Sequence, residues 1–318
     1  MDKRIGIGIG LLILSILYLT VGPEKIIAAF SRFNFVFLLL TLIPIAFTFL
    51  VSGLNLYFFA QPVLKISFKE SVTLSNLLFA INAFLPGHLG ELFVATFLEK
   101  KGARLGSTSA MVFLDKLISL VAVLIFVALS VAFFLENTLV MLLLGIAGLM
   151  ILSFFSLTPT GRVLVRKVIQ RFFPTEKPLL EGFGKTIQLY LFEKKRILLN
   201  LVLSILRLVI ASMTLYIVFL GFGLSPPIIP FVILSIASLL IGYIPITPSG
   251  IGLKEGSLVY LYTLISIPVE ISLLALTIVL IINQATSGLF FVLYYPTISQ
   301  YLRSFSLKGI FSPPGHRN

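Results

Sequence analysis

The 318-residue chain contains no cysteine, and only 11% of its residues are charged. Without cysteine it can form no disulfide, thiolate metal site or thiol nucleophile. A soluble domain has roughly 25% charged residues, whereas in this chain 58% of the residues are hydrophobic and the mean hydropathy is +1.11. The scarcity of charge therefore indicates an integral membrane protein.

Several apolar segments are long enough to cross a bilayer, which takes about 20 helical residues. Six such segments are residues 5–22, 35–60, 107–135, 138–158, 197–220 and 271–295. The first has no signal-peptide cleavage pattern, so we interpret it as a span. Its Gly6 and Gly10 lie one helical turn apart, which favours close packing against a neighbour. We expect an all-α integral membrane protein, one polytopic domain over residues 1–318 with about six full spans.

The distribution of basic residues predicts the orientation of the chain. Nine Lys and Arg residues lie in 159–196, whereas 136–137 and 221–226 have none, so 159–196 is predicted to be cytoplasmic. Both termini, including the polar tail 296–318, should lie on the same side of the cell membrane. The basic linker fits either an amphipathic helix on anionic headgroups or a plain cytoplasmic loop. Because its charge follows membrane topology, nucleic acid is not expected as a partner.

Two further hydrophobic regions, residues 71–98 and 227–267, are each interrupted by proline and glycine. The interruptions contain Pro86, Gly87 and Gly90 in the first region and Pro248, Gly250 and Gly252 in the second. Broken backbone survives in a membrane only where protein or water surrounds it. The arms of about 10 to 18 residues suggest helices of roughly 15 to 27 Å, mostly too short to span. We therefore predict two re-entrant hairpins that enter from opposite faces.

These hairpins would make residues 35–158 and 197–295 inverted copies of each other. Inverted repeats whose broken helices meet at the membrane midplane are a recurrent transporter architecture. The alternative is that one arm of each hairpin spans fully, which gives eight or more ordinary helices.

Charged side chains inside apolar sequence are the candidate substrate-binding residues. They are Glu91, Asp115, Lys116, Arg207, Lys254 and Glu255, together with His88 in the first break. A lone charge as deep as Arg207 costs about 3 kcal/mol, so it needs a partner or a wet cavity. The basic residues could attract a phosphate that the carboxylates replace when the site is empty. Alternatively, all six could form ion pairs that hold the repeats in register, and His88 could shuttle protons or simply form a structural hydrogen bond.

Two motifs carry a resemblance to a known family. The stretch 82–119, with Pro86 to Glu91 and then Leu114, Asp115 and Lys116, resembles the transmembrane region of the lysylphosphatidylglycerol synthase family, and so does 244–255. The resemblance implies a multi-pass bacterial or archaeal membrane protein of a flippase-like group that handles lipids. In that family the acid matching Asp115 is commonly followed by Arg, whereas this chain has Lys116, which lacks the planar fork that grips phosphate.

Bifunctional members of the family carry a soluble aminoacyl transferase domain after the membrane region, and this sequence ends at Asn318. We therefore expect a transporter that moves a phospholipid or polyprenyl-linked lipid between leaflets without chemistry. The alternatives are a membrane-embedded transferase, with Glu91, Asp115 or Glu255 as its base, and a non-catalytic membrane subunit. The sequence has no P-loop, zinc-binding helix or paired-Asp metal motif, so no metal or cofactor is expected. The expected partners are anionic or phosphate-bearing lipids, with a partner transferase and a homo-oligomer left open.

Overall fold

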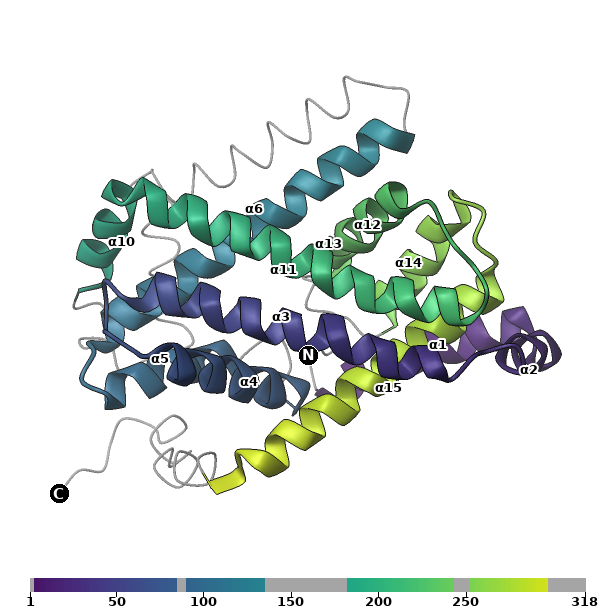
Figure 1. The fold of residues 1–318 in the computed structure, drawn as a ribbon, viewed down its shortest axis with the longest axis horizontal. Helices are drawn as coiled ribbons and strands as arrows, with labels where there is room; N and C mark the ends of the chain where they lie inside the picture. The colour runs from purple at the N-terminus through teal and green to yellow at the C-terminus, as the bar shows by residue number, and fades with distance from the viewer. Residues whose placement is uncertain (1–2, 85–89, 135–181, 243–251, 297–318) are drawn as a thin grey trace.

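The computed structural model describes residues 3–84, 90–134, 182–242 and 252–296, and every regular element in these ranges is a helix. Figure 1 shows their arrangement. The helices are α1 (Lys3–Val21), α2 (Pro23–Phe30), α3 (Val36–Ala60), α4 (Phe68–Phe84), α5 (Gly90–Lys100), α6 (Leu105–Phe134), α10 (Phe183–Phe192), α11 (Lys194–Gly221), α12 (Ile228–Ala237), α13 (Leu239–Gly242), α14 (Leu253–Thr263) and α15 (Val269–Leu293).

Four of the described helices are long and apolar enough to cross a membrane: α3, α6, α11 and α15. They have 25 to 30 residues each, or roughly 37 to 45 Å of helix. They match four of the predicted spans, and α1 coincides with the first predicted span. The predicted span 138–158 lies outside the described residues. The prediction of an all-helical membrane protein is therefore confirmed, and the total of six spans stays a prediction.

The outer surfaces of the long helices are apolar. Leu39 on α3 is 68% exposed and Val292 on α15 is 70% exposed, and Phe47, Leu198 and Ile281 are also exposed. Soluble monomers rarely expose contiguous apolar surface of this kind. Lipid chains can cover it, which agrees with the membrane setting.

The regions predicted as hairpins appear as short helices. The first region forms α4, with 17 residues, and α5, with 11 residues. The second forms α12, α13 and α14, with 10, 4 and 11 residues. In Figure 1, α4 and α5 lie beside the left half of α3, whereas α12 to α14 lie toward the right end of α11. The residues that join the arms, 85–89 and 243–251, lie outside the described ranges.

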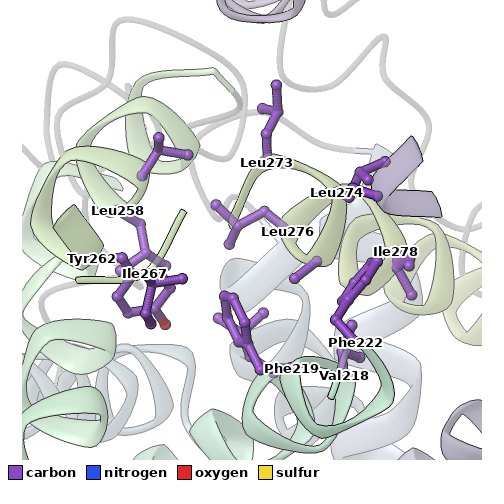
Figure 2. Packing of buried hydrophobic residues seen from close by; sticks show 14 of the residues in the cluster. Val218, Phe219, Phe222, Leu258, Tyr262, Ile267, Leu273, Leu274, Leu276 and Ile278 are labelled. Carbon is purple, nitrogen blue, oxygen red and sulfur yellow. The ribbon is translucent and has the colours of Figure 1, made fainter. Parts of the chain in front are cut away.

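The described helices share three hydrophobic cores, and each of the two largest contains residues of one of these regions. In the first core, part of which is shown in Figure 2, Phe219 of α11 and Tyr262 of α14 pack at 5.4 Å between ring centroids. Phe231 of α12 stacks on Tyr262 at 5.0 Å. The second core joins α3, α4, α5 and α6 through residues that include Phe59, Leu74, Leu98 and Met111.

Close contact between α3 and α4 depends on Gly53 of α3. A Cβ atom at this position would lie 2.4 Å from Cγ2 and 2.8 Å from Cα of Val72 on α4. Only glycine allows the two backbones to approach so closely. This contact fixes α4 against α3.

The last part of the predicted linker 159–196 is docked on the bundle. Thr186 and Tyr190 of α10 are buried, and the Tyr190 hydroxyl donates a hydrogen bond to the carbonyl oxygen of Phe59. Burial raises the pKa of Tyr190, so this hydroxyl keeps its proton. Arg196 Nη1 also donates to the carbonyl oxygen of Phe58 at 2.9 Å. The stretch predicted as an amphipathic helix lies outside the described residues.

A polar clasp closes the base of the α4 and α5 pair. The Glu70 carboxylate accepts hydrogen bonds from Ser67 N at 2.8 Å and Ser67 Oγ at 2.9 Å, and Glu70 N donates to Ser67 Oγ at 3.3 Å. This reciprocal arrangement is a capping box. Lys101, which follows α5, also pairs with Glu70. The hydrogen bond from Lys101, followed by those from Ser67, lowers the pKa of Glu70 from 4.5 to about 2.

The substitution Glu70→Gln should lower the free energy of unfolding by about 0.5 kcal/mol at neutral pH, because glutamine can keep the hydrogen bonds of the capping box but loses the negative charge that the helix N-terminus favours. Solvent screens the exposed Lys101 pair, so that pair adds little. Because the folded-state pKa is depressed, the stabilisation is complete above pH 4.5 and is lost as pH falls through about 2. Thermal unfolding midpoints of the two proteins should therefore differ at pH 7 and converge at low pH. The exposed Glu99→Gln is the control, and a Glu70→Gln midpoint equal to it at pH 7 would contradict the clasp.

Candidate functional site

A cavity of about 410 Å³ lies beside the second core. Phe59, Val94 and Met111 of the second core contribute to its wall, and so does Val279, which packs against the first core. The polar lining residues are Thr48, Ser52, Asn55, Ser75, Asn82, Asp115, Lys116, Arg207, Thr214 and Asn283. The long helices α3, α6, α11 and α15 all line the cavity, so its wall combines spans from both halves of the chain.

The polar side chains reach this region because each helix carries them on one face. On α11, Asn200, Ser204 and Arg207 are separated by four and three residues, which places them on the same side of a helix. Thr48, Ser52 and Asn55 have the same spacing on α3, and Asp115 and Ser119 are one turn apart on α6. Packing of α3 and α6 against α11 brings these faces together.

Asp115 is held by two amide side chains from different helices. Asn200 Nδ2 donates to Asp115 Oδ1 at 2.8 Å, and Asn55 Nδ2 donates to the same oxygen at 3.4 Å. Asn55 Nδ2 also lies 3.5 Å from Ser204 Oγ. We call Asn55, Asp115, Asn200 and Ser204 the Asp115 cluster. It joins α3, α6 and α11 around one carboxylate.

Arg207 lies at the middle of α11 and lines the cavity one turn beyond the Asp115 cluster. Its Nη2 atom donates to Ser119 Oγ at 3.4 Å. Among the residues that the structure describes, Arg207 forms no ion pair with a carboxylate. Lys116, which follows Asp115 on α6, lines the same cavity. Two basic side chains therefore share a cavity wall inside otherwise apolar helices.

Lys254 and Glu255 lie apart from this group, at the start of α14. Glu255 is 5% exposed, and its Oε2 accepts the Gly252 N–H at 2.7 Å while its Oε1 is 3.5 Å from Lys254 Nζ. The carboxylate thus caps its own helix, which favours negative charge at this end. Neither residue is among the described residues that line the cavity.

The remaining predicted residues are described only in part. Gly90 is the first residue of α5, and Glu91 follows it in the same turn, but the Glu91 side chain is outside the description. Of the other predicted positions, His88, Pro86, Gly87, Pro248 and Gly250 lie outside the described residues.

The second predicted break ends at a close contact between two backbones. Gly252 has a φ of 85°, and a Cβ atom there would lie 2.5 Å from the carbonyl oxygen and 3.0 Å from the Cα of Gly10 on α1. The predicted close packing of the first helix therefore occurs at Gly10. This contact places the start of α14, with its capping Glu255, directly against α1.

Sequence reasoning based on charge overlooked Asn55, Asn200 and Ser204. Each is less than 4% exposed and belongs to the Asp115 cluster. The signal that could have revealed them is a polar residue repeated at helical spacing within a long apolar segment. In a membrane helix, neutral polar side chains of this kind indicate a contact with another helix, because they form hydrogen bonds between helices.

Comparison with known proteins places the chain in a family. The family model described as "Lysylphosphatidylglycerol synthase TM region" matches residues 4–290. The chain belongs to this family. The resemblance drawn from the two motifs is thus confirmed, and every residue of the cavity wall falls within the matched range.

Two relatives are archaeal proteins. A UPF0104 membrane protein of Methanocaldococcus jannaschii is 27% identical over 187 residues, which cover 58% of this chain and 79% of that protein. A UPF0104 membrane protein of Methanothermobacter thermautotrophicus is 43% identical over 53 residues, which cover 17% of this chain and 15% of that protein. No solved structure matches the chain.

Proposed function

We propose that the protein moves a phosphate-bearing lipid between the leaflets of the cell membrane. The observation that carries the proposal is the placement of Arg207 and Lys116 in one cavity wall at the depth of the long apolar helices. A charge at such depth is costly and usually marks a substrate or ion path. Arginine and lysine bind phosphate oxygens through short, charge-assisted hydrogen bonds. The cavity, at about 410 Å³, is within the range of small-ligand sites.

The remainder of the cavity wall suits a lipid. Phe49, Phe79 and Leu78 give it an apolar side next to the basic residues. A headgroup can therefore bind the cations while its acyl or prenyl chains stay in contact with apolar surface. The family description names the membrane region of a lipid synthase, which supports the same class of substrate. In this proposal the protein performs no chemistry, and a separate transferase makes the lipid.

The proposal includes the inverted arrangement of the two short-helix regions. With α4 and α5 as one re-entrant hairpin and α12 to α14 as the other, the two hairpins bury their apolar residues in different cores, and α4 and α5 line the cavity together with the long helices. Rocking of one repeat against the other would open the cavity to each side in turn. The basic segment 159–196 and both termini are then cytoplasmic.

Single cysteines can test this topology because the natural chain has none. Lys69 at the base of α4 and Ser225 before α12 are both exposed. We expect Lys69→Cys to react with an impermeant thiol reagent only from the cytoplasmic side and Ser225→Cys only from the outside. Reaction of both positions from the same side would rule out the inverted repeat.

Transport can be tested directly with the purified protein in liposomes. Fluorescent lipids with a phosphate headgroup and a phosphate-free glycolipid with the same chains would be followed by selective quenching of the outer leaflet. We expect the protein to accelerate translocation of the phosphate-bearing lipid only. Equal rates with and without protein would overturn the proposal. Chromatography of the lipid afterwards would show conversion to a new product if the protein were instead a transferase.

A further inference from the structure

Two acceptor atoms of the Asp115 cluster have no hydrogen-bond partner among the residues that the structure describes. They are the side-chain oxygens of Asn55 and Asn200, which are fully buried in residues that are only 3% and 2% exposed. A buried acceptor without a partner costs about 1–3 kcal/mol. Because two such atoms lie in side chains that contact the same carboxylate, we infer that they are satisfied in another state of the protein. In that state they would interact with a ligand that binds several oxygens at once.

Rotation of the two amides converts the cluster into a set of oxygen ligands. Each amide now directs its nitrogen to Asp115 Oδ1. A half-turn about the last side-chain bond exchanges the oxygen and the nitrogen of an amide without moving the backbone. The two amide oxygens would then face the Asp115 carboxylate, and Ser204 Oγ already lies 3.5 Å from the Asn55 amide. Carboxylate, amide and hydroxyl oxygens are the ligands of hard cations.

Charge and spacing restrict which cation fits. The cluster has one carboxylate, which balances the charge of a monovalent ion but not that of a divalent ion at low dielectric. Oxygen ligands lie about 2.4 Å from Ca²⁺, and Na⁺ has a similar radius. In an octahedral arrangement around such an ion, neighbouring oxygens are about 3.4 Å apart. The atoms that now face Asp115 Oδ1 lie 2.8 and 3.4 Å from it. A small monovalent ion matches this spacing better than K⁺.

We propose that Asn55, Asp115, Asn200 and Ser204 form a Na⁺-binding site between α3, α6 and α11. The binding site rests on this geometry alone. Its role in coupling rests on the proposed function: the empty Asp115 carboxylate partly cancels the charge of Arg207 in the same cavity wall, whereas bound Na⁺ neutralises the carboxylate. Na⁺ occupancy would thus strengthen the attraction of the cavity wall for a lipid phosphate, and an inward Na⁺ gradient would drive transport.

Binding of ²²Na⁺ to the purified protein in detergent tests the site without any transport assay. We expect saturable binding of about one Na⁺ per chain and a rise in thermal midpoint when NaCl replaces choline chloride at constant ionic strength. Asp115→Asn should weaken Na⁺ binding by at least tenfold, because it removes the only carboxylate of the cluster. Glu255→Gln, the same change at a buried carboxylate elsewhere, should leave Na⁺ binding intact.

Several results would overturn the site. They are the absence of saturable Na⁺ binding to the natural protein, equal binding of K⁺, or full Na⁺ binding by Asp115→Asn. If Asp115→Asn does not fold, Asn55→Ala and Asn200→Ala each remove one amide oxygen and should each weaken Na⁺ binding, and unchanged binding in both contradicts the proposal. Na⁺ binding without any lipid movement would instead leave the site standing and refute the transport function.

Discussion

Replacing Gly252 by alanine should destabilise the protein by about 3 kcal/mol. The backbone there has a φ of 85°, which costs a residue with a Cβ about 1–2 kcal/mol. The new methyl group would also lie 2.5 Å from the carbonyl oxygen of Gly10, so α1 and α14 must separate. Overpacking of this kind adds about 1–3 kcal/mol. The thermal midpoint of the purified protein in detergent measures the loss.

Gly256→Ala is the matched control on the same helix. A Cβ at Gly256 would meet only side-chain atoms of Leu17 and Ile13, at 3.6 and 3.9 Å. This change should therefore be neutral or stabilise α14, because alanine is favoured over glycine in a helix by about 1 kcal/mol. Equal midpoints for the two alanine variants would show that the Gly10 contact does not hold α1 in place.

Replacing Arg207 by leucine should reduce translocation of a phosphate-bearing lipid by about 100-fold while the protein stays folded. A hydrogen bond to a charged group contributes roughly 1.5–3 kcal/mol, and the loss of one such bond near the upper end of this range corresponds to about that factor. Stability should be unchanged or higher, because the described residues give Arg207 no carboxylate partner and a buried lone charge is costly. Translocation and thermal midpoints would be measured on the same preparations.

Arg207→Lys separates attraction from geometry. Lysine keeps the charge but lacks the planar fork of arginine, so partial activity would indicate simple attraction, and almost none would indicate bidentate binding. Arg104→Leu removes an exposed basic residue before α6 and should transport normally. A large loss of stability in Arg207→Leu, with transport recovered when Asp115→Asn is added, would instead identify a structural ion pair.

The positions of the long helices could be predicted from sequence because they follow from local composition. Predicted spans 107–135 and 197–220 correspond to α6 and α11, which begin at Leu105 and Lys194. Each helix therefore begins two or three residues before the predicted span. At α11 the helix includes the charged residues Lys194 to Arg196, which the apolar segment excludes. Hydropathy marks the hydrocarbon region and not the end of the hydrogen-bonded helix.

The candidate site could be predicted only in part, because it depends on packing between distant segments. Asp115 meets Asn55, 60 residues before it, and Asn200, 85 residues after it, and no local pattern specifies such pairing. Glu255 illustrates the same limit. Its position next to Lys254 gave no indication of whether it reaches across the bundle or caps its own helix. That outcome depends on the backbone of Gly252, whose positive φ directs its N–H to the carboxylate.

The central claim, that this cavity binds the headgroup of a phosphate-bearing lipid, is tested most directly by a cysteine at Ala211. This exposed residue lines the cavity one turn beyond Arg207 on α11. An impermeant thiol reagent should label Ala211→Cys in liposomes. A phosphate-bearing lipid should slow this labelling at least fivefold more than the matched glycolipid, and the difference should vanish when Arg207→Leu is added. Equal labelling rates with the two lipids in the Arg207 protein would contradict the account.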